Sequence, residues 1–243
     1  MKHLHQKTNI EELLKTDDFI KQLSVDCVIF GFHNETLKVL LLKHLDFDLW
    51  SVPGGFVFQD EDIDEAAYRL VCERTNLKDL FLEQFHTFGR KDRNKDDMHH
   101  RVVQKHNLDV DENHWIHQRF VTIGYYALID YTLSETIPDG FNAQCYWYDI
   151  SDLPPLVFDH REIIETALIH LRKNLDYKVV GSNLLPNEFT MNQLQILYET
   201  ILGEKLRRNN FQRKILSLGI LERMEKLYTG SANKAPYLYK FIK

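Results

Sequence analysis

The chain has 243 residues, of which 44% are hydrophobic and 12% aromatic, which suits one large globular domain and a smaller one. The polar, charge-broken stretch Met1 to Lys15 does not resemble a signal peptide, and the aliphatic run Val39–Leu42 is far shorter than the ~20 residues of a membrane helix. Three widely spaced cysteines, Cys27, Cys72 and Cys145, disfavour structural zinc and fit a reducing cytoplasm.

Hydrophobic periodicity predicts alternating strands and helices over the first three quarters of the chain. Every second residue from Val25 to Gly31 falls on one side of an extended segment. Asp159 opens a helix with Glu162 three residues later, which is the spacing of a capping box. The predicted strands are Ser24 to Phe32, Lys38 to Lys43, Leu80 to Phe88, Phe120 to Asp130 and Cys145 to Asp149, and the predicted helices are Glu61 to Thr75 and Asp159 to about Asn174.

The segment from Gly55 to Leu77 carries a known pattern. Glu61 follows Gly55 after five residues, Arg69 follows after seven more, and the bulky positions beyond it are filled. This arrangement resembles the Nudix hydrolase signature G-x5-E-x7-R-E-U-x-E-E-x-G-U, where U is bulky and apolar. The preceding Trp50–Val57 resembles the strand and loop that lead into the Nudix helix. The resemblance implies an α/β/α sandwich that holds Mg²⁺ between the helix and a diphosphate.

Three positions depart from the signature. Leu70 and Arg74 stand where glutamates are expected, and Asn76 stands where the second glycine is expected. Residues four apart project from one face of a helix, so this face would offer an apolar group and a permanent cation to a metal that prefers carboxylates. Glu73 alone would hold a metal weakly, and Arg69 can pair with it at i, i+4. We therefore expect no catalytic residues, no bound metal and no cofactor.

A small-molecule site is expected beside the Nudix helix, against the sheet. Arg74 could pair with a phosphate or bond a sugar hydroxyl, because its charge is fixed. For the aromatic candidates, simple core packing is an equal alternative. The candidate effector-binding residues are Trp50, Phe56, Arg69, Glu73, Arg74, Phe88, Tyr125 and Trp147.

An insertion separates this chain from the family pattern. Twenty-odd extra residues, within Lys91 to Gln118, follow the Phe88-Gly89 turn, and this segment holds five of the twelve histidines. His114 and His117 could share a metal if the segment were helical, although no recognised zinc spacing is present. A solvated loop and an effector lid are the alternatives.

The C-terminal part has a different pattern. Asp176 to Glu188 reads as a linker, and Thr190 with Gln193 predicts a capped helix that ends at Gly203. A basic helix is predicted over about Asn209 to Leu218, with Phe211, Ile215 and Leu218 on one face. Strands over Leu221 to Tyr228 and Tyr237 to Phe241 would flank a small, basic loop from Thr229 to Pro236. This order predicts a winged helix-turn-helix.

The charge distribution supports a polyanion partner for this part. Residues 182–243 hold ten Lys/Arg against five Glu, although the whole chain has a net charge of −6. Amide and guanidinium groups read base edges, and other cations contact phosphates. A basic helix packed on the first domain, with a solvated outer face, is the alternative. The candidate DNA-binding residues are Arg207, Arg208, Asn209, Gln212, Arg213, Lys214, Ser231, Asn233 and Lys234.

An eroded Nudix box followed by a winged helix resembles the NrtR-type Nudix-related transcriptional regulators of bacteria. Phe189-Thr190, Leu194-Gln195, Leu197–Glu199, Ile201–Gly203, Asn210-Phe211 and Arg213–Leu216 carry the resemblance in the C-terminal part. The resemblance implies a homodimer that binds palindromic operator DNA and senses ADP-ribose or a sugar.

The expected domains are an effector-sensing domain over residues 1–175 with the insertion at about 91–118, a linker over 176–188 and a winged helix over 189–243. Two other functions remain open: a Nudix pyrophosphatase with a regulatory DNA-binding tail, and a Nudix-like scaffold whose basic tail binds protein or RNA. Leu70 and Arg74 count against the enzyme.

Overall fold

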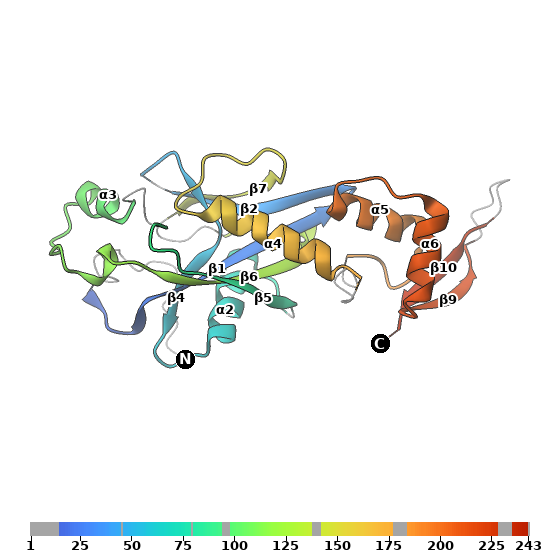
Figure 1. Ribbon diagram of the computed structural model, residues 1–243, viewed down its shortest axis with the longest axis horizontal. Helices are drawn as coiled ribbons and strands as arrows, with labels where there is room; N and C mark the ends of the chain where they lie inside the picture. The colour runs from blue at the N-terminus through green and yellow to red at the C-terminus, as the bar shows by residue number, and fades with distance from the viewer. Residues whose placement is uncertain are drawn as a thin grey trace.

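The computed structural model describes residues 15–44, 46–78, 80–93, 98–137, 142–176, 184–227 and 235–242. Figure 1 shows an elongated molecule, with α3 at one end, the winged helix at the other and α4 running between them. None of the helices in these ranges is long and apolar enough to cross a membrane.

Seven strands of the described residues form one mixed sheet. Its order is β3-β2-β1-β6-β5, with β4 on β1 and β7 on β2, and β1 and β6 are parallel. The strands are β1 (Phe19–His33), β2 (Thr36–His44), β3 (Trp50–Ser51), β4 (Gly54–Phe58), β5 (Leu82–Phe88), β6 (Val121–Asp130) and β7 (Asn142–Asp149).

The sheet is covered on both faces, as the predicted α/β/α sandwich requires. Side chains alternate across a strand, so Val25, Cys27 and Ile29 pack on the side of α2 (Ile63–Thr75). The intervening residues, such as Phe30, pack on the side of α4 (His160–Asn174). The predicted period of two in the first strand is thereby confirmed.

The capping box predicted for α4 is wrong. Asp159 occupies the N-cap position, but its side chain makes no capping hydrogen bond. It accepts instead from Arg93 Nη2 at 2.9 Å, and Glu162 pairs with Arg90 at 3.4 Å. Arginines far away in sequence therefore take the carboxylates that the local pattern assigned to the helix end.

The insertion forms its own small layer. It contains α3 (Met98–Lys105) and a 3-10 turn (Trp115–His117), neither of which the sequence predicted. Trp115 and Ile116 join Phe120 in a separate apolar cluster, against which Phe56 packs. The insertion is thus tied to the Nudix loop rather than fully solvated.

The C-terminal part is the predicted winged helix. Its elements are β8 (Phe189–Thr190), α5 (Met191–Leu202), α6 (Arg208–Ser217), β9 (Leu221–Lys226) and β10 (Tyr237–Phe241), with sheet order β8-β10-β9. Thr190 and Gln193 form the predicted capping box, and Gly203 ends α5 with φ 74°. Leu218 differs from the prediction, because α6 ends one residue earlier and leaves its side chain 37% exposed.

Glu199 fixes the turn between α5 and α6. Its carboxylate accepts from Lys205 Nζ at 2.8 Å, from Gln195 Nε2 at 2.7 Å and from the Leu206 amide at 3.0 Å. These donors, the lysine first, lower the pKa of Glu199 to about 2. The carboxylate is therefore ionised across the physiological range and holds the chain where it enters α6.

The two parts share one apolar core, which also contains polar contacts. Buried residues of β1, α4, α5 and α6 belong to a single cluster. Tyr198 donates its hydroxyl to the Leu175 carbonyl at 2.9 Å, and Arg172 Nε donates to the Ile201 carbonyl at 2.8 Å. The winged helix is thus docked on the end of α4.

Replacing Tyr198 with phenylalanine should lower the free energy of unfolding by about 1–2 kcal/mol, because the buried Leu175 carbonyl loses its donor. Urea unfolding followed by circular dichroism measures the loss. The matched control is Tyr237→Phe, since Tyr237 is 40% exposed, and it should cost less than about 0.5 kcal/mol. Equal stability of Y198F and wild type would contradict the docking role of this hydroxyl.

Candidate functional site

The Nudix loop and helix are fastened by one ion pair. Arg69 donates to both carboxylate oxygens of Glu61, at 2.9 and 2.6 Å, and to the Phe56 carbonyl at 3.0 Å. Glu61 also accepts from the Phe58 amide at 2.8 Å. Arg69 lies 3.8 Å from Glu73, so the predicted i, i+4 pair is present. These signature residues hold the loop in place through contacts that need no metal.

Of the three positions that depart from the signature, Leu70 and Arg74 are buried, whereas Asn76 is exposed. Leu70 is 4% exposed and lies in the core between α2 and the sheet, where its Cδ2 would be 2.7 Å from a Cβ at Gly55. Arg74 is 7% exposed, and its carbonyl accepts from the Ile137 amide at 3.1 Å. The face that would carry metal ligands in a Nudix hydrolase is therefore packed against protein. That Arg74 contacts an effector stays a prediction.

The eight candidate effector residues do not converge on one point. Trp50 and Phe88 pack in the core on the α4 side of the sheet. Tyr125 and Trp147 pack on the α2 side, with Arg69, Glu73 and Arg74 on α2 itself. Phe56 belongs to the insertion cluster, with its ring 5.3 Å from that of Trp115. The prediction grouped them because it did not assign each strand residue to one face of the sheet.

On the α2 side, Tyr125 joins the sheet to the helix. Its hydroxyl donates to Asp64 and lies 3.5 Å from Gln84 Oε1. Burial, and then the Asp64 carboxylate, raise the pKa of Tyr125 above its usual value. The phenol is neutral at physiological pH and serves as a hydrogen-bond donor.

The histidines of the insertion lie near one another and pack against aromatic or acidic neighbours. The rings of His100 and His117 stack at 3.9 Å, and His106 Nε2 lies 2.7 Å from an oxygen of Asp46. His99 packs against Phe120 and Phe158, and its burial lowers its pKa to about 4. Within the described ranges, no three His, Cys, Asp or Glu are placed to hold a metal.

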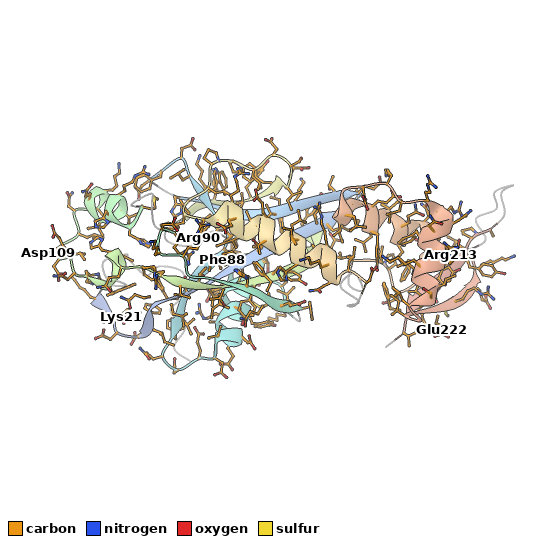
Figure 2. All side chains as sticks on the ribbon, viewed as in Figure 1. Lys21, Phe88, Arg90, Asp109, Arg213 and Glu222 are labelled. Atoms are coloured by element: carbon orange, nitrogen blue, oxygen red, sulfur yellow. The ribbon has the colours of Figure 1, made fainter. Side chains whose placement is uncertain are left out.

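A buried polar cluster lies where the insertion meets the first turn of α4. Arg93 Nη2 is 2.9 Å from Asp159 and 3.6 Å from Asp26, and His160 Nε2 is 3.9 Å from Asp26. His160 Nδ1 accepts from the Val52 amide at 3.1 Å. Figure 2 shows Phe88 and Arg90, which precede Arg93 in the sequence, beside the start of α4. Sequence reasoning missed it, although a carboxylate inside the apolar run of β1 was a signal.

The helix α6 has one buried face and one exposed face, and that the exposed face binds DNA stays a prediction. Phe211 and Ile215 are buried, and the Phe211 ring lies 5.2 Å from that of Tyr198. Figure 2 places Arg213 on α6, at the opposite end of the molecule from Lys21. Exposed residues of the predicted set are Arg207, Arg208, Asn209, Arg213 and Lys214, whereas Gln212 is half-buried.

In the predicted DNA-binding set, one lysine is held in an ion pair and three residues lie outside the described ranges. Lys214 Nζ lies 2.6 Å from Asp176 Oδ2, at the end of α4, so a phosphate would compete with that carboxylate. Ser231, Asn233 and Lys234 lie outside the described residues. Among the described residues, Arg223 and Lys226 of β9 lie 4.7 and 5.2 Å from the Tyr237 ring.

Comparison with known proteins gives matches over both parts. The NUDIX domain profile matches residues 20–167, and the profile of the NrtR DNA-binding winged helix domain matches residues 181–241. The ADPR responsive transcriptional repressor NtrR of Acinetobacter baylyi is 27% identical over 226 residues, which is 90% of this chain and 81% of that protein.

Solved structures match over nearly the whole chain. Shewanella oneidensis NrtR complexed with a 27mer DNA is 26% identical, with a TM-score of 0.68, over 91% of this chain and 94% of that one. A MutT/nudix family protein from Enterococcus faecalis, 20% identical, has a TM-score of 0.68 over 97% and 94% of the two chains, which shows a shared fold.

Replacing Leu70 with glutamate should lower the free energy of unfolding by about 3 kcal/mol, because a carboxylate would be buried against apolar neighbours. Thermal and urea unfolding measure the effect. Glu73→Gln on the same helix is the control and should change stability by less than about 0.5 kcal/mol, since the Glu73 side chain is 40% exposed. An L70E variant as stable as wild type would show that position 70 is open to solvent.

Proposed function

The chain belongs to the Nudix domain family and ends in a winged helix of the NrtR type, and we propose that it is a transcriptional regulator whose Nudix domain senses a small molecule. The observation that carries the proposal is the joint match of both parts to a repressor over 90% of the chain. A similar protein was solved with DNA bound. The small, basic C-terminal part would contact operator DNA, and the larger part would bind the effector.

The recognition helix of this regulator is α6. The exposed side chains of Asn209 and Arg213, with Gln212 beside them, suit contacts to base edges in the major groove. Arg207 and Arg208 stand at the start of the helix and suit phosphate contacts. The opposite face of α6 supports this assignment. Phe211 and Ile215 are buried there, so the side chains of Asn209 and Arg213 point away from the protein core.

The effector is a pentose-like sugar or an ADP-ribose-like nucleotide. A relative that is called ADPR responsive supports the nucleotide. Binding shifts operator affinity only if the effector prefers one conformation of the protein over the other. Typical couplings of about 1–3 kcal/mol would change operator affinity roughly five- to 150-fold.

The Nudix domain of this regulator is catalytically inactive. Leu70 and Arg74 are both buried and stand where glutamates would hold Mg²⁺, and Glu73 alone would hold it weakly. Glu61 is engaged by Arg69. These contacts support a sensor over the alternative of a pyrophosphatase with a DNA-binding tail.

The regulator acts as a homodimer on palindromic DNA. A symmetric pair of α6 helices would read two half-sites that are separated by a whole number of ~10-bp turns. In complexes of helix-turn-helix dimers, the palindrome of the operator mirrors the two-fold symmetry of the protein. This rule supports the same arrangement for a winged helix of this type.

Arg213→Ala and Arg208→Ala should each weaken operator binding. The first should cost about 1–3 kcal/mol at one base position, and the second should weaken all sequences and flatten the salt dependence. Fluorescence anisotropy measures both, on a duplex selected from random DNA by the wild-type chain. Lys21→Ala is the control, because Lys21 lies at the opposite end of the molecule (Figure 2). Unchanged affinity in both arginine variants would mean that α6 is not the recognition helix.

Incubation with ADP-ribose or other nucleoside diphosphates and excess Mg²⁺ or Mn²⁺ should release no product at an enzymatic rate. The reason is the loss of carboxylates at Leu70 and Arg74. Chromatography of the nucleotides measures turnover, and operator binding by the same preparation controls for folding. Turnover of roughly 1–10³ per second, the ordinary enzyme range, would restore the hydrolase alternative.

A further inference from the structure

The cluster at the first turn of α4 has hydrogen-bonding capacity that the protein does not use. The Asp26 side chain is 9% exposed, and Arg93 Nη2 and His160 Nε2 lie 3.6 and 3.9 Å from its oxygens, beyond hydrogen-bonding distance. Arg93 is 5% exposed, and its Nε is buried without a hydrogen-bond partner in the described part of the chain. A buried donor such as Arg93 Nε is costly to leave unsatisfied, so a further polar partner is expected.

The three groups define what that partner must offer. His160 Nδ1 accepts from the Val52 amide, so a neutral ring carries its proton on Nε2, toward Asp26. Burial, first of all, lowers the pKa of His160, which keeps the ring neutral. Asp26 can only accept, and Arg93 Nε can only donate. A hydroxyl group does both, and two adjacent hydroxyls match the two oxygens of a carboxylate.

The charge of the cluster excludes a phosphate at this point. Asp26 and Asp159 carry two negative charges, Arg93 carries one positive charge, and His160 is neutral. The excess negative charge repels an anion and favours groups that donate hydrogen bonds. The cluster is therefore suited to the sugar hydroxyls of a ligand rather than to its phosphates.

The loop at Gly54 and the ring of Phe158 pack closely against the cluster. A Cβ at Gly54 would lie 2.3 Å from Asp26 Oδ1, so glycine lets the loop approach the carboxylate. Phe158 has φ 50°, in the left-handed region that non-glycine residues rarely adopt, and its ring lies 5.7 Å from that of His160. Strained backbone of this kind gathers at ligand sites, where the rest of the fold holds it.

We propose that this cluster binds a vicinal diol of the effector, as found in a free pentose or in a ribosyl nucleotide. The inference rests on the proposed sensing function and moves the site from α2 to the start of α4. The segment that carries Arg93 is held to α4 by the buried pair of Arg93 and Asp159 at 2.9 Å and by the exposed pair of Arg90 and Glu162 at 3.4 Å.

The site also lies at one end of the helix that supports the winged helix. The other end of α4 carries Leu175, whose carbonyl accepts from Tyr198, and Asp176, which pairs with Lys214 on α6. A displacement of α4 on ligand binding would therefore reach the recognition helix through direct contacts.

Calorimetry of the full chain with D-ribose, 2-deoxy-D-ribose and ADP-ribose tests the proposal. Asp26→Asn and Arg93→Met should each lower ligand affinity at least about tenfold, since each removes a charged hydrogen-bonding group. Glu165→Gln, an exposed carboxylate-to-amide change on the same helix, should leave affinity unchanged. Loss of one hydroxyl should make 2-deoxy-D-ribose bind about tenfold more weakly than D-ribose if the free sugar is the effector, whereas binding of ADP-ribose alone identifies the nucleotide.

A second measurement on wild-type protein does not depend on how well the variants fold. The ¹³C-histidine NMR signal of His160, assigned by its loss in His160→Gln, should shift on ligand addition. Ligand affinity unchanged in both Asp26→Asn and Arg93→Met, or a His160 signal unmoved at saturation, would overturn the proposal. Failure of wild type to bind any of the three ligands would overturn it as well, while operator binding by the same preparation would leave the DNA-binding function standing.

Discussion

The apolar layer between the sheet and α4 continues without a break into the winged helix, and the arrangement of the molecule depends on this continuity. Phe30 of β1, Ile164 of α4, Leu197 of α5 and Ile215 of α6 belong to one buried cluster. Burial of apolar surface is non-directional, so it holds the two parts together without fixing their relative orientation. The hydrogen bond from Tyr198 to α4 adds the direction. Packing and this polar contact therefore position α6 relative to α4.

Local periodicity was sufficient for most of the fold. The alternation from Val25 to Ile29 and the Thr190–Gln193 capping box act over a few residues, and both appear as predicted. The pairing of β1 with β6 joins positions about a hundred residues apart, and the sequence pattern did not predict it. Leu218 lies at a helix end, where one residue of fraying changes which side chains are covered.

The candidate site was harder to predict because its contacts are not local. Asp159 had the spacing of a cap, but an arginine 66 residues earlier in the chain takes its carboxylate. Trp50 and Tyr125 were grouped by chemical type, although the sheet places them on opposite faces. Asp26 was passed over as part of a strand, since nothing in its neighbourhood shows that Arg93 and His160 come to it. Charges brought together by tertiary structure leave little trace in sequence spacing.

Asn76 departs from the Nudix signature but keeps the backbone conformation that the signature glycine would adopt. Where the signature has glycine, Asn76 takes the left-handed conformation with φ 55° and donates its amide to the Cys72 carbonyl, so the helix ends in the same way. Asparagine is the residue that tolerates this conformation best after glycine. The backbone shape at the end of α2 is therefore formed without glycine, whereas position 70 holds a buried apolar side chain in place of a carboxylate. Similarity scores that weigh both positions equally measure kinship, and enzymatic competence must be judged from the carboxylates alone.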